Sequence, residues 1–410
     1  MSAGDGSMVL RGGRVLTMGR APGARRGSAV GELHAIDGCD VRIEGGRVVG
    51  VGRGLEIAPG EDIFDASGRV VMPAFVDCHT HACWAGDRLD EWEQKRRGAT
   101  YLEILQSGGG IMSTVRAVRA ASEAQLRDGL LARLSVMLAE GTASVEVKSG
   151  YGLSTEDELK MLRAIGAAGE AWAGTLRMTA CLGHAKDPSR ADFVDVTINE
   201  TLEAVHDEFP DVTIDAYCEQ GAWSLDECLR LFDRAFELGH DCRVHADQFN
   251  SLGMTPEAVR RSFRSVDHLE ATSGGDLRAL AESDTFGVML PCSGFHVDGR
   301  YADGRGFLDA GGLLAIATNA NPGSAPCLSM PTVVALAGRH LGLTPAEAIG
   351  ACTVNAAALL GLDDRGRIAP GTFADLVILR HTDERQLAYE FGARHVDTVI
   401  VGGKVVSGSP

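Results

Sequence analysis

Two histidines separated by a single residue follow a short apolar stretch near residue 75. The sequence reads Val76-Asp77-Cys78-His79-Thr80-His81. Because side chains two residues apart project from the same face of a strand, His79 and His81 can present both imidazoles to one metal ion. The same spacing also arises in hydrogen-bonded surface pairs, so the motif alone is a modest indication of a metal site.

Two further histidines stand at the ends of short apolar runs. The run Cys242-Arg243-Val244 is followed by His245, and the run Ser265-Val266-Asp267 is followed by His268. Three protein ligands and one position left open for water are typical of a catalytic metal site. The recurrence of histidine at the ends of strand-like runs therefore favours a metal-dependent enzyme.

The middle of the chain alternates between strand-like and helix-like stretches. This alternation predicts a parallel sheet with crossover helices, and eight such strands close into a (β/α)8 barrel of the TIM type. We predict strands at 70–76, 143–148, 175–181, 212–218, 242–246, 264–267, 286–290 and 313–318. Apolar residues at helical spacing predict helices over 111–140, 155–171, 224–239 and 344–361.

Both ends of the chain contain Gly-Gly pairs flanked by β-branched residues, which predict tight hairpins. The pairs are Gly12-Gly13, Gly45-Gly46 and Gly402-Gly403. We therefore expect the two ends to build one small β-sandwich domain together. The predicted fold class is α/β, with the β-sandwich formed by 1–70 and 366–410 and the barrel by 71–365.

The composition excludes several classes of partner. The 410-residue chain carries a formal net charge of −17, which repels nucleic acid and anionic membranes, so we expect neither as a partner. Its ten cysteines include no Cys-x-x-Cys pair, which favours buried, reduced thiols. The start of the chain lacks the pattern of a signal peptide, and no apolar run reaches about 18 residues. We therefore expect a cytoplasmic protein.

Polar side chains gather where the predicted strands end. Barrels of this type build their active sites on the face formed by the carboxyl ends of their strands. One such residue means little, but a series on successive strands predicts a shared site. The residues are His79, His81, Lys148, His184, Glu219, His245, His268, Asn319 and Asn321.

The chain resembles the amidohydrolase superfamily and, within it, the imidazolonepropionase family of histidine degradation. The resemblance extends from the first predicted hairpins to Lys404. Two of its motifs, Lys-Ser-Gly-Tyr-Gly and Asn-Pro-Gly-Ser, are specific to that family rather than to the superfamily. The matching motifs are Asp77-Cys78-His79-Thr80-His81, Gly108 to Val115, Glu146 to Leu153, Val244 to Gln248, Val266 to Leu269, and Asn321-Pro322-Gly323-Ser324.

The resemblance implies hydrolysis of 4-imidazolone-5-propanoate to N-formimidoyl-L-glutamate, by opening the ring at its amide bond. It also implies one divalent metal ion, Zn²⁺ or iron, with His79, His81 and His245 as ligands. His268 matches a histidine beside the scissile carbonyl, where it could polarise the oxygen or stabilise the oxyanion. Three imidazoles and an oxygen suit either metal, so the choice stays open. The resemblance further implies a homodimer.

A substrate site also follows from the resemblance. Arg88 matches the arginine that binds the carboxylate tail of the small-molecule substrate, and a planar guanidinium suits a carboxylate. Without the resemblance, Arg88 would be interpreted as a solvated surface arginine among three acidic neighbours. The other matches to substrate contacts are Tyr151, His184, Gln248, Asn321, Gly323 and Ser324.

Asn319 departs from the superfamily pattern, which commonly has an aspartate there as metal ligand and proton acceptor. An asparagine can coordinate weakly through its carbonyl oxygen, but it cannot accept a proton at pH 7. We nevertheless predict that Asn319 is both a metal ligand and a catalytic residue. Three interpretations stay open: His268 or Glu219 acts as the base, the metal binds loosely, or the chain is a catalytically impaired relative that binds substrate. The intact substrate motifs favour an active enzyme.

One alternative concerns the function, and another concerns the number of metal ions in the site. Another cyclic amidohydrolase or a deaminase would keep the four histidines but would not need Arg88 or Asn321-Pro322-Gly323. Some barrel hydrolases carboxylate a lysine at a strand end so that it bridges two metals. We expect Lys148 instead to tie the loop that carries Tyr151, and the site to hold one ion.

Overall fold

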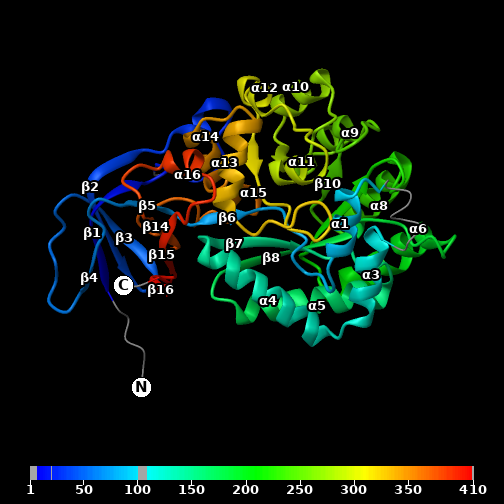
Figure 1. Ribbon diagram of the computed structural model, residues 1–410, viewed down its shortest axis with the longest axis horizontal. Helices are drawn as coiled ribbons and strands as arrows, with labels where there is room; N and C mark the ends of the chain where they lie inside the picture. The colour runs from blue at the N-terminus through cyan, green and yellow to red at the C-terminus, as the bar shows by residue number, and fades with distance from the viewer. Residues whose placement is uncertain (1–6, 20, 100–108, 409–410) are drawn as a thin grey trace.

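The computed structural model describes residues 7–19, 21–99 and 109–408, which form two eight-stranded sheets with helices around them (Figure 1). One sheet comes from the middle of the chain. The other combines strands from both ends of the chain (Figure 1).

Eight parallel strands form the first sheet in the order in which they occur in the chain. Beyond the strand ends, Asn319 N–H donates to the His79 carbonyl at 3.0 Å and His81 N–H donates to the Ala320 carbonyl at 2.9 Å. These bonds join the last strand to the first, and the predicted (β/α)8 barrel is confirmed. The strands are β6 (Phe75–Asp77), β7 (Thr142–Lys148), β8 (Thr175–Gly183), β9 (Thr213–Cys218), β10 (Arg243–Ala246), β11 (Ser265–His268), β12 (Phe286–Met289) and β13 (Leu314–Ile316).

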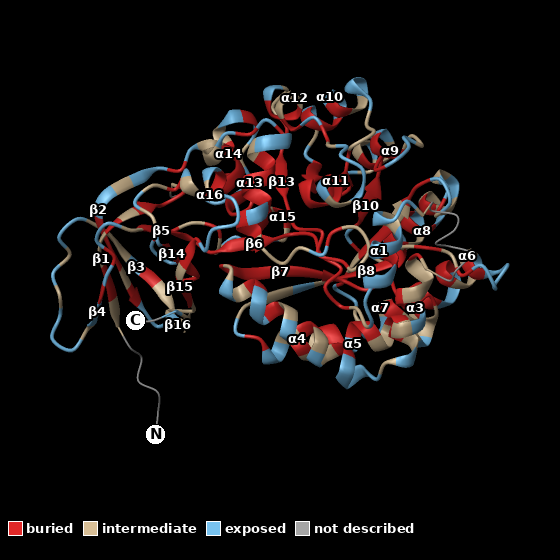
Figure 2. Ribbon diagram, in the orientation of Figure 1, coloured by how far each residue is buried: buried red, intermediate tan, exposed pale blue. Residues whose placement is uncertain are grey.

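Most residues of the barrel strands are buried (Figure 2). Every residue of β7 and of β10 to β13 is buried. Such strands have one face against helices and the other inside the barrel, so both faces are buried and the alternation of buried and exposed residues is absent. Their few charged residues, including Glu146, Arg243 and Asp267, pair with one another inside the barrel.

Helices cover the outside of the barrel (Figure 1). In α8 the apolar face is buried, and a capping box between Ser224 and Glu227 fixes the first turn. Among the described residues, no helix is both long and apolar enough to cross a membrane. The α-helices are α1 (Leu89–Arg96), α3 (Ile111–Ala120), α4 (Glu123–Ala139), α5 (Thr155–Ala171), α6 (Phe193–Val196), α7 (Leu202–Glu208), α8 (Leu225–Glu237), α9 (Met254–Arg260), α10 (Gly274–Glu282), α11 (Pro291–Val297), α12 (Gly304–Asp309), α13 (Met330–His340), α14 (Pro345–Ala351), α15 (Val354–Leu359) and α16 (Gln386–Tyr389).

The second sheet joins both chain ends, as predicted. Its order is β16-β15-β14-β5-β1-β2-β3, with β4 paired to β1. The β3 edge meets the segment before β14, where Ala374 N–H donates to the Gly46 carbonyl at 2.9 Å, so the sheet encloses an apolar core of its own. The strands are β1 (Met8–Leu16), β2 (Ala35–Glu44), β3 (Arg47–Gly52), β4 (Asp62–Asp65), β5 (Val70–Pro73), β14 (Leu376–Leu379), β15 (Val396–Val401) and β16 (Lys404–Ser407).

One predicted barrel strand and one predicted hairpin are wrong. Residues 70–76 divide into β5, which belongs to the end sheet, and β6, which begins the barrel. The apolar run is continuous because both strands are buried, so the sequence does not reveal the change of sheet. Gly12-Gly13 makes no turn and lies inside β1 at an irregularity in its pairing with β2. The turns predicted at Gly45-Gly46 and Gly402-Gly403 are present.

Two of the predicted helices are interrupted. The stretch 111–140 forms α3 and α4, because α3 ends at Ala120 and Ser122 begins the second helix by accepting from Gln125 N–H. The stretch 344–361 forms α14 and α15, which are separated at Cys352 and Thr353. Apolar spacing continues across both breaks, since each pair of helices packs on the same barrel.

Gly350 in α14 allows a close approach of the N-terminal 3-10 turn η1 (Gly27–Gly31), because a Cβ there would lie 1.9 Å from the Val30 carbonyl oxygen. We expect Gly350→Ala to lower the free energy of unfolding by about 1–3 kcal/mol, as overpacking does. Gly275→Ala in α10 is the control: its nearest contact is 3.7 Å, so it should be neutral or stabilising. Urea unfolding compares the two variants, and equal effects would contradict this packing argument.

Candidate active site

Four histidines from three barrel strands lie together at the carboxyl ends of those strands. His79 and His81 follow β6, His245 lies in β10, and His268 ends β11. One ring nitrogen from each of His79, His245 and His268 lies within 4.8 Å of the other two. The Nε2 atoms of His81 and His245 are 3.0 Å apart. All four side chains are buried, so the structure brings together the four predicted histidines.

Buried carboxylates orient two of these imidazoles. His79 Nδ1 lies 2.6 Å from Asp267 Oδ2, and His245 Nδ1 lies 3.1 Å from Asp215 Oδ1. A proton on Nδ1 that is donated to the carboxylate leaves Nε2 with its lone pair. Carboxylates commonly stand behind metal-binding histidines in this way, where they fix the tautomer and the orientation of the ring.

Two buried ring nitrogens, His79 Nε2 and His81 Nδ1, have no hydrogen-bond partner among the described residues. A buried polar atom without a partner costs free energy, and a bound ion would remove that cost at His79. Burial also lowers the pKa of His79 and of His81 well below the usual value, so both rings are neutral. Neutral imidazole is the form that binds a metal, and the residues therefore fit one.

Two buried cations balance the carboxylates around the histidines. Arg243 pairs with Asp267 at 2.7 Å and with Glu146 at 3.3 Å. Lys148 Nζ pairs with Glu146 at 2.6 Å and with Asp215 at 2.8 Å. The prediction that Lys148 ties the following loop is therefore wrong. Its ammonium lies inside the barrel because buried carboxylates need a counter-charge.

A second group of potential ligands, Cys181, Asp215 and His245, also has its ligand atoms within 4.8 Å of one another. Lys148 already neutralises Asp215, and burial raises the pKa of Cys181 well above its usual value. The group therefore offers a protonated thiol and a paired carboxylate, which suit a metal ion poorly. This favours the predicted single ion at the histidine cluster.

Asn319 lies in the segment that follows β13, the last barrel strand. Its backbone has a positive φ of 54°, and its N–H donates to the His79 carbonyl at 3.0 Å. The side-chain Nδ2 donates to Ser293 Oγ at 2.7 Å. Only Oδ1 then carries lone pairs that a metal could use, and this neutral oxygen is a weaker ligand than a carboxylate.

His268 has an unusual backbone. Its φ is 94° and that of Leu269 is 75°, both in the region that favours glycine. Such strain persists only where the surrounding structure enforces it, and it is common at functional sites. His268 Nδ1 lies 3.3 Å from Glu270 Oε1, so a carboxylate faces this ring as well.

Arg88 precedes α1 and is not the solvated surface arginine that its acidic neighbours alone would suggest, because its side chain is 11% exposed. A Cβ on Gly323 would lie 3.3 Å from Arg88 Nη1. The same Nη1 donates to Thr114 Oγ1 at 3.4 Å. The guanidinium therefore lies against the loop that follows the last barrel strand.

The Asn321 side chain holds that loop in shape. Its Oδ1 accepts from Gly323 N–H at 2.9 Å and from Ser324 N–H at 2.7 Å, and its Nδ2 donates to the Asn319 carbonyl at 2.7 Å. Asparagine side chains often stabilise tight turns through such bonds to nearby backbone N–H groups. The predicted substrate residues of this loop are thus placed next to both Asn319 and Arg88.

The remaining predicted substrate residues surround the histidines. His184 stacks on His81 with ring centroids 4.5 Å apart, and the Tyr151 ring lies 5.0 Å from His184. Burial lowers the pKa of His184 to about 3, so this ring is neutral. Gln248 Oε1 accepts from Tyr217 Oη at 2.7 Å, which fixes the orientation of the amide.

Glu219, one of the two residues considered as a base, is engaged by the loop after β10. Its Oε2 accepts from the backbone N–H groups of Phe249 at 2.8 Å and Asn250 at 3.1 Å. Its Oε1 accepts from Gln220 N–H and from Asn250 Nδ2, each at 2.8 Å. Both oxygens organise this loop, which favours a structural role for Glu219.

Three charged residues of the site, Asp215, Asp267 and Arg243, were not predicted from the sequence. Each lies within a short, mostly buried strand. A charge in such a strand is costly unless it is paired, and that signal could have identified all three residues.

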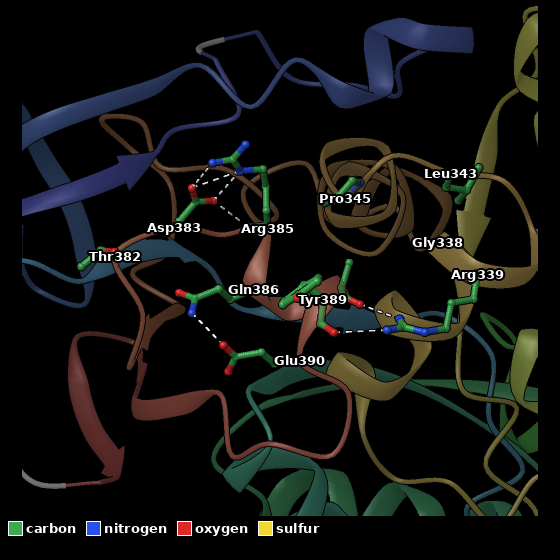
Figure 3. A pocket seen from close by; sticks show the side chains of 11 residues that line it. Gly338, Arg339, Leu343, Pro345, Thr382, Asp383, Arg385, Gln386, Tyr389 and Glu390 are labelled. Atoms are coloured by element: carbon green, nitrogen blue, oxygen red, sulfur yellow. Dashed lines mark hydrogen bonds and ion pairs between the residues drawn. The ribbon is translucent and has the colours of Figure 1, made fainter.

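One pocket of about 730 Å³ lies elsewhere, between α13 and α16 (Figure 3). Its polar groups are engaged with their neighbours: Arg385 pairs with Asp383, Gln386 Nε2 donates to Glu390 at 2.9 Å, and Arg339 donates to the Ala388 carbonyl at 2.6 Å. The described residues that line this pocket include no histidine or cysteine, so they do not offer the chemistry of the histidine cluster.

Comparisons with known proteins agree with this geometry. Residues 70–406 match the sequence model of the Amidohydrolase family. The chain is similar to the imidazolonepropionase of Herpetosiphon aurantiacus, with 42% identity over 96% of this chain and 95% of that protein. It is equally similar to the imidazolonepropionase of Deinococcus radiodurans, with 42% identity over 93% of this chain and 95% of that protein.

Solved structures share the fold at low sequence identity. An atrazine chlorohydrolase from Arthrobacter aurescens, solved as a zinc complex, superposes with a TM-score of 0.72 at 17% identity, covering 98% of this chain and 95% of that one. An N-isopropylammelide isopropylaminohydrolase from Burkholderia multivorans superposes with a TM-score of 0.72 at 18% identity, covering 98% of each chain. At these identities the likeness concerns the fold alone.

Asp267→Asn tests the carboxylate behind His79. We expect the variant to bind Zn²⁺ about 10- to 100-fold more weakly, the usual effect of losing a carboxylate behind a ligand histidine. Competition with a chromophoric chelator measures the affinity, and circular dichroism checks the fold. Glu282→Gln, which is exposed at the end of α10, is the control and should bind Zn²⁺ as the wild type does. Unchanged affinity in Asp267→Asn would rule out this role.

Proposed function

Because the chain belongs to the amidohydrolase family and, within it, to the imidazolonepropionases, we propose that it hydrolyses 4-imidazolone-5-propanoate to N-formimidoyl-L-glutamate in histidine degradation. The enzyme is a hydrolase that acts on a carbon–nitrogen bond in a cyclic amide. One observation carries the proposal beyond family membership. The buried histidine cluster shares its end of the barrel with Arg88, whose guanidinium lies against the Gly323 loop.

The site would hold one divalent ion, Zn²⁺ or iron, through His79, His81 and His245, with Asn319 Oδ1 as a weak further ligand. When bound, such an ion lowers the pKa of a water molecule from about 15.7 towards about 7, which makes a nucleophile available at neutral pH. Imidazole nitrogens and one oxygen suit either metal. The Nε2 atom of His79 supports this assignment, because it is buried and has no hydrogen-bond partner in the part of the chain that the structure describes.

Arg88 would bind the propanoate tail of the substrate and so set the position of the ring. A guanidinium matches a carboxylate through two parallel hydrogen bonds, which fix direction as well as distance. The ring would then lie between the histidine cluster and the loop of Asn321, Gly323 and Ser324. Tyr151, His184 and Gln248 would form the walls around it. Holding the ring in one orientation supplies much of the rate acceleration for such a reaction.

His268 would act on the reacting carbonyl. Water adds to the carbonyl carbon, the ring carbon–nitrogen bond breaks, and the proton lost by water passes to the departing nitrogen. His268 can donate a hydrogen bond to the developing oxyanion, or hold that proton between the two steps, whereas an asparagine amide cannot accept it. With Glu219 engaged by its loop, His268 is the better candidate for the base.

The surroundings of this reaction are also part of the proposal. A net charge of −17 disfavours nucleic acid and anionic membranes as partners. The ten cysteines are free thiols, which a reducing compartment such as the cytoplasm would preserve. A homodimer is proposed from the family alone.

Turnover by metal-analysed protein tests the function. We expect the wild type to open the ring of 4-imidazolone-5-propanoate with about one ion per chain. Asn319→Asp should raise kcat by up to about 100-fold, because it adds a carboxylate that can accept the proton. Ser293 tolerates either side chain, since its hydroxyl can accept from the amide or donate to a carboxylate. Product chromatography measures both rates.

Two outcomes would contradict the proposal. If the metal-loaded wild type binds the substrate without turnover while Asn319→Asp is active, the chain is a substrate-binding relative that has lost its proton acceptor. If a neutral cyclic amide or an aminated heterocycle is turned over in preference, the substrate assignment is wrong.

A further inference from the structure

The Arg88 side chain is held in place by a nearby carboxylate, that of Glu91. Its Nε donates to Glu91 Oε2 at 2.6 Å, and its Nη2 pairs with the same oxygen. Glu91 lies in the first turn of α1, three residues after Arg88, so the helix itself brings the two side chains together. The side chains are 11% and 9% exposed, which distinguishes this pair from the solvated pair of Glu93 with Arg97.

Glu91 also binds the helix that carries the other contact of Arg88. Its Oε2 accepts from Gly110 N–H at 2.9 Å, and Gly110 caps the start of α3. Thr114, in the first turn of α3, accepts from Arg88 Nη1 at 3.4 Å. One carboxylate oxygen therefore fixes both the guanidinium and the helix against which it rests. The other oxygen pairs with Lys95 at 3.1 Å.

The contacts of Glu91 determine which edge of the guanidinium remains for a ligand. Glu91 occupies the edge formed by Nε and Nη2. The opposite edge, formed by Nη1 and the second hydrogen of Nη2, is the one that lies near Gly323. A carboxylate can form two parallel bonds with that edge. A Cβ at residue 323 would lie 3.3 Å from Nη1, so glycine keeps this approach open.

We propose that Glu91 is the positioning residue that holds Arg88 with its outer edge turned towards the substrate's carboxylate. The inference rests on the proposed function, because it deepens the recognition of a carboxylate-bearing ring. Without Glu91, the guanidinium loses two of its bonds and its long side chain regains many rotamers. The affinity for the substrate's carboxylate then falls, while the rate of the chemical step at the ring changes little.

The charge balance of the cluster supports this role. Arg88 and Lys95 are cationic and Glu91 is anionic, so the group keeps one net positive charge for one substrate carboxylate. Burial alone would raise the pKa of Glu91, but the Gly110 N–H bond and the charge of Arg88 lower it instead, so the carboxylate is ionised. An uncharged residue at position 91 would leave Arg88 without its counter-charge.

The test compares Glu91→Gln with Glu93→Gln, which removes an exposed ion pair with Arg97 from the same helix. We expect Glu91→Gln to raise KM for 4-imidazolone-5-propanoate roughly 10- to 100-fold, the range for losing a hydrogen bond to a charged group, with kcat changed less than about threefold. Glu93→Gln should behave as the wild type. A merely structural role would instead lower kcat and the thermal midpoint together.

A double-mutant cycle with Arg88→Met shows whether Glu91 acts through Arg88. Glu91→Gln should cost nothing further in the Arg88→Met background, because the residue that it positions is gone. Full additivity of the two losses would overturn the proposal.

Binding of unreactive imidazole compounds tests the positioning role of Glu91 independently of the proposed activity. Titration of imidazole-4-propanoate should show the same 10- to 100-fold loss in Glu91→Gln, as roughly expected for one charge-assisted bond, even if the wild type has no turnover. Titration of 4-ethylimidazole, which lacks the carboxylate, should show no loss. Equal weakening for both rings, or no weakening for either, would overturn the positioning role. Absence of turnover with intact carboxylate-dependent binding would overturn the proposed activity alone.

Discussion

The pairing of two buried cations with three buried carboxylates is the constraint on which the site depends. Arg243 and Lys148 share Glu146, and each pairs with one further carboxylate. Those two carboxylates, Asp267 and Asp215, in turn face the Nδ1 atoms of His79 and His245. Burying such charges is costly unless each has a partner. The histidines are therefore oriented by a network in which loss of Arg243 would leave Asp267, and loss of Lys148 would leave Asp215, without its cation.

This network also requires the barrel strands to pair in the correct register. Its members come from β7, β9, β10 and β11, so four strands must be in register for the charges to meet. A shift of one residue in any strand would turn its charged side chain towards the helices outside. The same interactions that orient the imidazoles thus select the correct register of the sheet. Function and folding specificity are carried by one set of side chains.

Much of this architecture could be predicted from local patterns. The alternation of strands and helices predicts the barrel, and histidines at strand ends predict where the site lies. The sequence could not show that Val70–Pro73 leaves the barrel for the end sheet, because burial gives both strands the same apolar character. It also could not show the partners of Lys148, since those depend on contacts across the barrel interior. Long-range pairing of charges has no local signature beyond a polar residue in an apolar run.

The position of β5 has a consequence for how the chain is made. β5 pairs with β1 on one side and with β14 on the other, and β14 lies about 300 residues later in the chain. During synthesis, the edge of β5 that pairs with β14 stays unpaired until Leu376–Leu379 has left the ribosome. An unpaired strand edge invites pairing with other chains. Translation that stops before β14 would therefore give a chain with a nearly complete barrel and an exposed β5 edge that can pair with other chains.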